Sequence, residues 1–156
     1  MSIYVDENTR VIVQGITGSQ GSFHTDLMLK YGTKVVAGTN PSKAGTEVCG
    51  VPVYATVKEA KEKTGDNASI IFVPPFAAAG AIIEAADADL DICVCVTENI
   101  PINDMVKVND HLRNRKMRLI GPNCPGIISP GKCKLGIMPQ DIHLKDMWAL
   151  FPGADR

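Results

Sequence analysis

The sequence predicts one α/β domain in which helices flank a parallel β-sheet. Short runs rich in Val and Ile alternate with stretches of helical pattern, and this alternation is typical of βαβ units. Near the N-terminus a strand also runs directly into a glycine-punctuated turn that a helix follows. With 156 residues, 45% of them hydrophobic, the chain is long enough to form a single domain with its own core.

The predicted strands are short apolar segments that suit a sheet buried on both faces. They lie at residues 11–14, 34–37, 69–73, 92–96 and 118–120, with a further short strand at 51–54. The helical stretches between them lie at 21–30, 57–63, 77–86 and 102–115. We expect Thr56 and Asn103 to be N-caps, and Gly32 and Gly65 to stop the helices that precede them. Right-handed crossovers would wind these elements into a Rossmann-like sheet.

We expect this domain to span residues 1–139. Beyond the segment 134–139 the pattern is lost, and residues 140–156 hold the only Trp of the chain among scattered charges. They are predicted to form a divergent tail. No repeat, low-complexity tract or interdomain linker is present in the sequence.

Composition excludes several classes of function. The net charge of −1 indicates no excess of basic residues that would bind nucleic acid or a membrane surface. No apolar run approaches the roughly 18 residues that span a bilayer, and the N-terminus lacks signal-peptide features. Five cysteines without a C-x-x-C pair fit neither a disulfide scaffold nor a zinc site. We therefore expect a reducing compartment, the cytoplasm or alternatively the mitochondrial matrix.

The glycine turn predicts a phosphate-bearing ligand. Its glycines read G-x-x-G-x-x-G, one residue longer than the G-x-G-x-x-G turn of NAD-binding proteins, and they lie at 15, 18 and 21. Free backbone N–H groups at a helix N-terminus bind anions. Thr17, Ser19 and Gln20 add hydroxyl and amide groups to the turn. In a sheet of this kind the other ligand contacts should follow the strands, at 38–45, 73–76, 96–101 and 121–126.

Residues after the second strand narrow the choice of ligand. No Asp or Glu stands where NAD-binding sheets hold the ribose, and the first charge encountered is Lys43. A cation there suits a phosphorylated ribose, as in NADP or coenzyme A, although a solvated loop lysine explains it equally well. Val73 and Pro74 begin a rigid ledge that suits an adenine ring or a pantetheine chain, or else a stiff turn.

Other reactive side chains give weaker signals. Cys124 lies in a tight Gly-Pro-Asn-Cys-Pro-Gly loop with no neighbouring His to activate it, so we expect no covalent role. His24, early in the first helix, either touches a ligand phosphate or packs as a neutral imidazole, and the second interpretation is favoured. His111 is expected to face solvent. No carboxylate pair or metal-ligand spacing stands out, so no metal site is predicted.

Many ordered motifs resemble the N-terminal CoA-binding domain of the succinyl-CoA synthetase (succinate–CoA ligase) α subunit. They include Q-G-I-T-G-S-Q-G from 14, P-S-K from 41, V-P-P from 73, T-E from 97, L-I-G-P-N-C-P-G from 119 and G-I-M-P from 136. The resemblance implies that Thr17, Gly18, Ser19 and Gln20 hold the CoA phosphates and that Lys43 gives a cationic contact. It also implies that Val96, Thr97 and Glu98 line the ligand, and that Asn123, Cys124 and Pro125 lie near its acyl end.

The same resemblance implies a ligase reaction of the tricarboxylic acid cycle. Succinate, CoA and a nucleoside triphosphate give succinyl-CoA, nucleoside diphosphate and phosphate through a phosphohistidine. Neither His111 nor His143 matches the phosphohistidine motif of the family, so no catalytic residue is predicted in this chain. A β subunit would supply Mg²⁺ and the site for ATP or GTP. Two other functions stay open: a stand-alone CoA-binding regulatory or scaffolding module, and an NADP-binding reductase domain.

Overall fold

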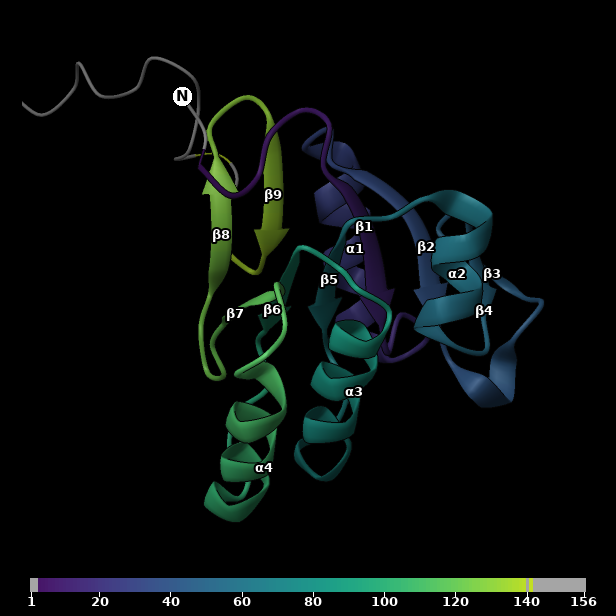
Figure 1. The fold of residues 1–156 in the computed structure, drawn as a ribbon. Coiled ribbons are helices and arrows are strands. Elements are labelled where there is room, and N and C mark those ends of the chain that lie inside the picture. Colours follow the sequence, from purple (N-terminus) through teal and green to yellow (C-terminus); the bar gives the residue numbers. More distant parts are fainter. Residues whose placement is uncertain (1–2, 140, 142–156) are drawn as a thin grey trace, which may run out of the picture.

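A computed structural model describes residues 3–139 and 141, and it consists of a central sheet with covering helices (Figure 1). The seven strands lie in the order β3-β4-β2-β1-β5-β6-β7. Their bounds are β1 (Arg10–Gln14), β2 (Lys34–Thr39), β3 (Glu47–Val48), β4 (Val51–Tyr54), β5 (Ala68–Ile71), β6 (Ile92–Cys95) and β7 (Arg118–Ile120). All neighbours are parallel except β3 and β4. The predicted Rossmann-like α/β domain is confirmed, whereas the predicted tail lies, residue 141 apart, outside the described residues.

Helices cover both faces of the sheet. They are α1 (Ser19–Lys30), α2 (Val57–Thr64), α3 (Pro75–Asp87) and α4 (Ile102–Leu112), and a short 3-10 turn η1 (Pro41–Lys43) follows β2. One core cluster joins α2, α3 and α4 to strand residues such as Ile12 and Ile71. The other joins α1 to the opposite face, through residues such as Met28 and Val13. None of the helices within 3–139 is long and apolar enough to cross a membrane.

The helix ends test the predicted caps. Thr56 caps α2, because its hydroxyl accepts from the Glu59 N–H at 3.2 Å, and Gly65 ends that helix with a φ of 65°. The prediction for Asn103 is wrong, because α4 already begins at Ile102 and Pro101 occupies the cap position. Gly32 lies one residue beyond the C-cap of α1, with a φ of 95° that favours glycine.

A two-stranded hairpin that the sequence did not predict follows β7. Its strands are β8 (Gly126–Ser129) and β9 (Cys133–Gly136), and they pair antiparallel. Leu135 and Cys133 of β9 are buried in the same core cluster as α1. The Thr33 hydroxyl fixes the hairpin further, because it donates to the Lys134 carbonyl and accepts from the Lys134 N–H, both at 2.9 Å.

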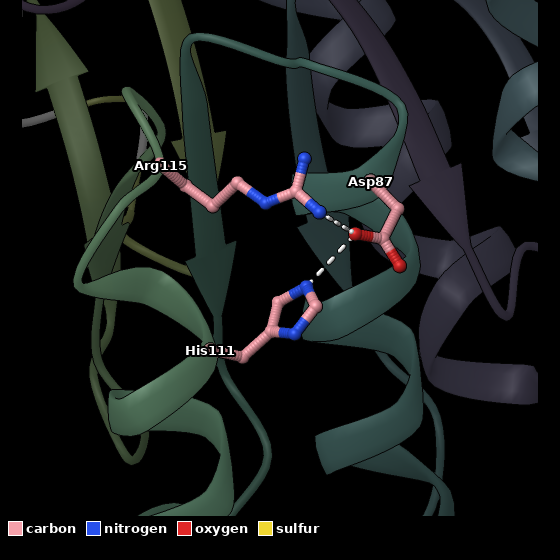
Figure 2. Close-up of polar contacts among 3 residues, drawn as sticks. All are labelled: Asp87, His111 and Arg115. Atoms are coloured by element: carbon pink, nitrogen blue, oxygen red, sulfur yellow. Dashed lines mark hydrogen bonds and ion pairs between the residues drawn. The ribbon is translucent and has the colours of Figure 1, made fainter.

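One polar cluster joins the C-terminal ends of α3 and α4 (Figure 2). His111 Nε2 lies 2.8 Å from Asp87 Oδ1, and Arg115 donates to the same oxygen at 2.6 Å. His111 thus forms a contact between two helices, and its side chain remains 31% exposed to solvent. The cluster lies at the opposite end of α3 from the glycine turn, so it holds the helices together without touching the candidate site.

Candidate functional site

The glycine turn carries the chain from β1 into α1 by a path that only glycine permits at two positions. Gly15 has a φ of 82°, and its N–H donates to the Thr39 carbonyl at 3.1 Å. Gly21, in the first turn of α1, packs so closely that an added Cβ would lie 2.2 Å from the Gly15 carbonyl oxygen. This close approach sets the start of α1 directly against the end of β1.

The N-terminus of α1 has no side-chain cap. Gly18 is its N-cap and has no side chain to accept from the first N–H groups of the helix. These N–H groups have no partner within a helix, and the helix dipole adds partial positive charge around them. Beside them the Asn40 amide donates to the Thr17 hydroxyl, which joins the loop after β2 to the turn. The arrangement suits an anion such as phosphate.

A cleft of about 590 Å³ opens at this end of the sheet. Six of the predicted contacts line it, namely Thr17, Gly18, Ser19, Gln20, Val73 and Pro74. Asn40 and Pro41 line it from the loop after β2, as the position of that segment predicts. The structure therefore brings together residues from three separate loops at the carboxyl ends of the strands.

The wall formed by α3 was not predicted from the sequence. Ala77, Gly80, Ala81 and Glu84 line the cleft from one side of this helix. Their spacing of three and four residues is that of a single helix face, and small residues on such a face are the signal that could have found them. Glu84 accepts from the Val57 N–H at 2.8 Å, so its carboxylate both holds the start of α2 and reaches the cleft.

A second hollow of about 210 Å³ adjoins the cleft. Gln20, Phe72 and Val73 line both spaces, so the two meet there. Val96 and Thr97, both predicted contacts, form part of the wall of the hollow. The Thr97 hydroxyl donates to the Val73 carbonyl at 2.8 Å and ties the ends of β6 and β5 together.

Lys43 and Glu98 lie outside the linings of both spaces. Both side chains are exposed, and Lys43 stands at the end of η1, two residues after Pro41. A long lysine side chain on the rim can reach a ligand without forming part of the wall. The contacts predicted for these two residues stay predictions.

The loop with Asn123, Cys124 and Pro125 lies next to the strand end that carries Thr97. The Asn123 N–H donates to the Thr97 carbonyl at 3.1 Å. The Cys124 thiol lies 3.4 Å from the Cys95 carbonyl, and burial raises the pKa of this thiol. The thiol is therefore mostly protonated at neutral pH, which disfavours its use as a nucleophile.

Comparisons with known proteins agree on the family. Residues 6–99 match the family described as "CoA binding domain". The chain is 60% identical to the succinate–CoA ligase [ADP-forming] α subunit of Staphylococcus epidermidis RP62A, over 93% of this chain and 48% of that protein. The α subunit of Staphylococcus aureus Mu50 is 59% identical over the same shares. The chain thus spans about half the length of the curated relatives it matches. The predicted resemblance is confirmed.

Among solved structures, the ATP citrate lyase of Methanothrix soehngenii, in complex with citrate and coenzyme A, superposes with a TM-score of 0.73. The superposition covers 85% of this chain and 24% of the lyase at 24% sequence identity. At that identity the likeness supports the fold alone.

Proposed function

The chain belongs to the CoA-binding domain family, and from this premise we propose that it binds coenzyme A in the cleft at the start of α1. The observation that carries the proposal is the helix N-terminus without a side-chain cap, at the turn 17–20 whose residues line the cleft. The diphosphate of CoA binds there. The ledge at Val73 and Pro74 flanks the adenine ring or the pantetheine chain.

Lys43 is the proposed cation for the 3′-phosphate on the ribose. It is exposed and lies two residues after Pro41, which lines the cleft from η1. An ammonium on a flexible side chain suits a phosphate that remains partly in solvent. Val96, Thr97 and Glu98 follow the ligand away from the phosphates, and Asn123, Cys124 and Pro125 lie near its acyl end.

We further propose that the chain is the CoA-binding portion of a succinate–CoA ligase α subunit. The 60% identity to such a subunit over 93% of the chain supports this assignment. In the full reaction, succinate, CoA and a nucleoside triphosphate give succinyl-CoA, nucleoside diphosphate and phosphate. A β subunit is the proposed partner and brings Mg²⁺ with ATP or GTP, and the proposed compartment is the cytoplasm rather than the mitochondrial matrix.

Thermal unfolding with four ligands tests the binding proposal. CoA at about 100 times its dissociation constant adds about 2.7 kcal/mol to the free energy of unfolding. For a domain of this size the melting temperature then rises by roughly 5–10 °C. We expect CoA to stabilise most, 3′-dephospho-CoA less, and NADH not at all. Stabilisation by NADPH but not by CoA would show a reductase-type domain and refute the proposal.

A matched pair of variants tests the role of Lys43. Lys43→Gln should weaken CoA about threefold to tenfold while leaving 3′-dephospho-CoA unchanged, because only CoA carries the ribose phosphate. Lys63→Gln removes the same charge from the exposed C-terminal end of α2 and should change neither affinity. If Lys43→Gln loses the same affinity for CoA and for 3′-dephospho-CoA, Lys43 does not contact the 3′-phosphate.

Co-purification separates the ligase subunit from a stand-alone CoA-binding module. A tagged form of this chain, expressed together with a succinate–CoA ligase β subunit, is expected to retain that subunit on a column. Binding of CoA without any retention of a β subunit would favour the stand-alone module. The two results therefore decide between a ligase component and a regulatory or scaffolding protein.

A further inference from the structure

His24 lies in the wall of the second hollow with an unusual set of neighbours. Its ring stacks on Phe72 at a centroid distance of 5.5 Å and an interplanar angle of 6°. The Phe23 ring meets it edge-on at 5.0 Å. These two contacts fix the plane of the imidazole, which α1 carries into the hollow beside Gln20 and Val96.

The imidazole is neutral near pH 7. Burial lowers its pKa, and the positive charge of Lys134 lowers it further. Lys134 is itself 99% buried on β9, in the hairpin that packs against α1. A neutral imidazole has one N–H donor and one acceptor nitrogen, and the choice between its two tautomers decides what it offers to a ligand.

The surroundings of the ring select the tautomer. Nδ1 is buried and has no hydrogen-bond partner among residues 3–139. A buried N–H without an acceptor is rarer and more costly than a buried lone pair without a donor. We therefore assign the proton to Nε2, which makes Nε2 the donor available to a ligand in the hollow.

Among the side chains that line the hollow, only Gln20 and Thr97 could donate a hydrogen bond besides His24. Its walls are largely apolar, with Phe72, Val73, Val96 and Ile137. The Thr97 hydroxyl already donates to the Val73 carbonyl. Gln20 is exposed at the junction with the phosphate cleft. A mostly apolar hollow with one fixed N–H donor suits an uncharged chain that carries amide carbonyls.

We propose that the hollow holds the pantetheine arm of CoA, and that His24 Nε2 donates a hydrogen bond to an amide carbonyl of that arm. This inference rests on the proposed function. It adds a specific positioning residue: His24 fixes the arm, whereas the turn at 17–20 fixes the phosphates. His24 thus acts on the part of the ligand that leads to the thiol.

Two variants in the full chain separate the hydrogen bond from the packing. His24→Phe keeps a ring stacked on Phe72 and removes the N–H donor. His24→Gln removes the ring and keeps an N–H donor on its side-chain amide. Titration calorimetry with CoA and with 3′-phospho-ADP, which lacks the arm, measures both affinities. We expect His24→Phe to weaken CoA about threefold to tenfold and to leave 3′-phospho-ADP unchanged, and His24→Gln to recover most of the CoA affinity.

A third ligand identifies the acceptor. Desulfo-CoA keeps the amides and lacks the thiol, so the penalty of His24→Phe should be the same for it as for CoA. Disappearance of the penalty with desulfo-CoA would assign the contact to sulfur and overturn the carbonyl assignment. Nitrogen-15 NMR of the histidine rings should show the His24 proton on Nε2, and a proton on Nδ1 would overturn the inference.

The controls distinguish the two proposals. Equal loss of CoA and 3′-phospho-ADP in His24→Phe, or no loss of either, overturns the role of His24 and leaves CoA binding intact. Failure of the unsubstituted chain to bind CoA at all overturns the proposed function, and this inference with it.

Discussion

Replacing Gly21 by Ala tests the close approach that builds the glycine turn. In an ordinary helix interior the change from Gly to Ala stabilises by roughly 1 kcal/mol, because Ala loses less backbone entropy on folding. At Gly21 the added Cβ would lie 2.2 Å from the Gly15 oxygen and 3.0 Å from the Ile16 Cα, and all of these neighbours are backbone. The main chain must shift, and forced overpacking of this kind costs about 1–3 kcal/mol.

The 2.2 Å approach to a backbone oxygen puts this cost in the upper part of the range, at about 2–3 kcal/mol. After the helix gain of about 1 kcal/mol is subtracted, we expect Gly21→Ala to lower the free energy of unfolding by about 1 to 2 kcal/mol. For a chain of this length the melting temperature should fall by roughly 2–8 °C, measured by circular dichroism without ligand. CoA affinity should fall as well, since the start of α1 moves relative to β1.

Gly80→Ala is the matched control for this substitution. Gly80 also lies within a helix, α3, and a Cβ there meets nothing within 4 Å. The same chemical change should stabilise the protein by about 0.5 to 1 kcal/mol. If both variants shift the melting temperature in the same direction, the steric account of the glycine turn is wrong.

Three further predictions concern side chains away from the turn. Asp66 Oδ2 is buried without a partner within the described chain, and burial raises the pKa of Asp66. The stability that this raised pKa gives is present at acid pH and is lost as the pH rises through the folded pKa. Asn does not titrate, so the free energy of unfolding of Asp66→Asn, measured by urea titration, should increase relative to that of the parent as the pH goes from acid to neutral. Asp87→Asn removes the half-exposed contacts between α3 and α4 and should lower the free energy of unfolding by about 1 kcal/mol or less. This loss should shrink in about 1 M salt, and a loss that salt does not change would argue against an ionic origin. An aromatic disulfide reagent should label exposed Cys49 first, because burial raises the pKa of Cys95 and Cys133 to about 11. A fast phase of thiol labelling that persists in Cys49→Ser would contradict this prediction.

The parallel sheet could be predicted because buried strands have a strong local signal. Strands such as Ile92–Cys95 consist almost entirely of β-branched and small apolar residues, and all of this one is buried. Several boundaries differ from the predicted ones by one to three residues, and two of these differences lie at the candidate site. The predicted strand at 69–73 ends at Ile71, and the next residues, Phe72 and Val73, line the cleft. Helix α1 begins at Ser19, two residues before the predicted position, because Gly18 takes the N-cap position and the N–H groups of a first helical turn need no partner within the helix.

The hairpin of β8 and β9 could not be predicted, because its burial depends on distant partners. Its strands are short, and Lys134 stands in the middle of β9, where a sequence pattern would place a solvent-facing residue. Tertiary packing overrides that pattern, because the backbone of Lys134 is held by the Thr33 hydroxyl and its side chain is covered. The α3 wall was missed for a similar reason, since Ala77 and Gly80 gain their role only when the loops of β1 and β2 face them.

Eight of the ten predicted cofactor contacts line the cleft or the adjoining hollow, although their strand ends are separate in sequence, because parallel strands share one carboxyl edge of the sheet. Hydrogen bonds also join several of these strand ends. The Asn40 amide binds the Thr17 hydroxyl, the Thr97 hydroxyl binds the Val73 carbonyl, and the Asn123 N–H binds the Thr97 carbonyl. Two of these bonds share Thr97. A ligand that touches the rim at several loops therefore meets groups already held in place, and less conformational entropy is lost on binding than with independent loops. A sequence pattern that locates strand ends therefore also locates the candidate site, because the carboxyl ends of parallel strands lie at the same edge of the sheet.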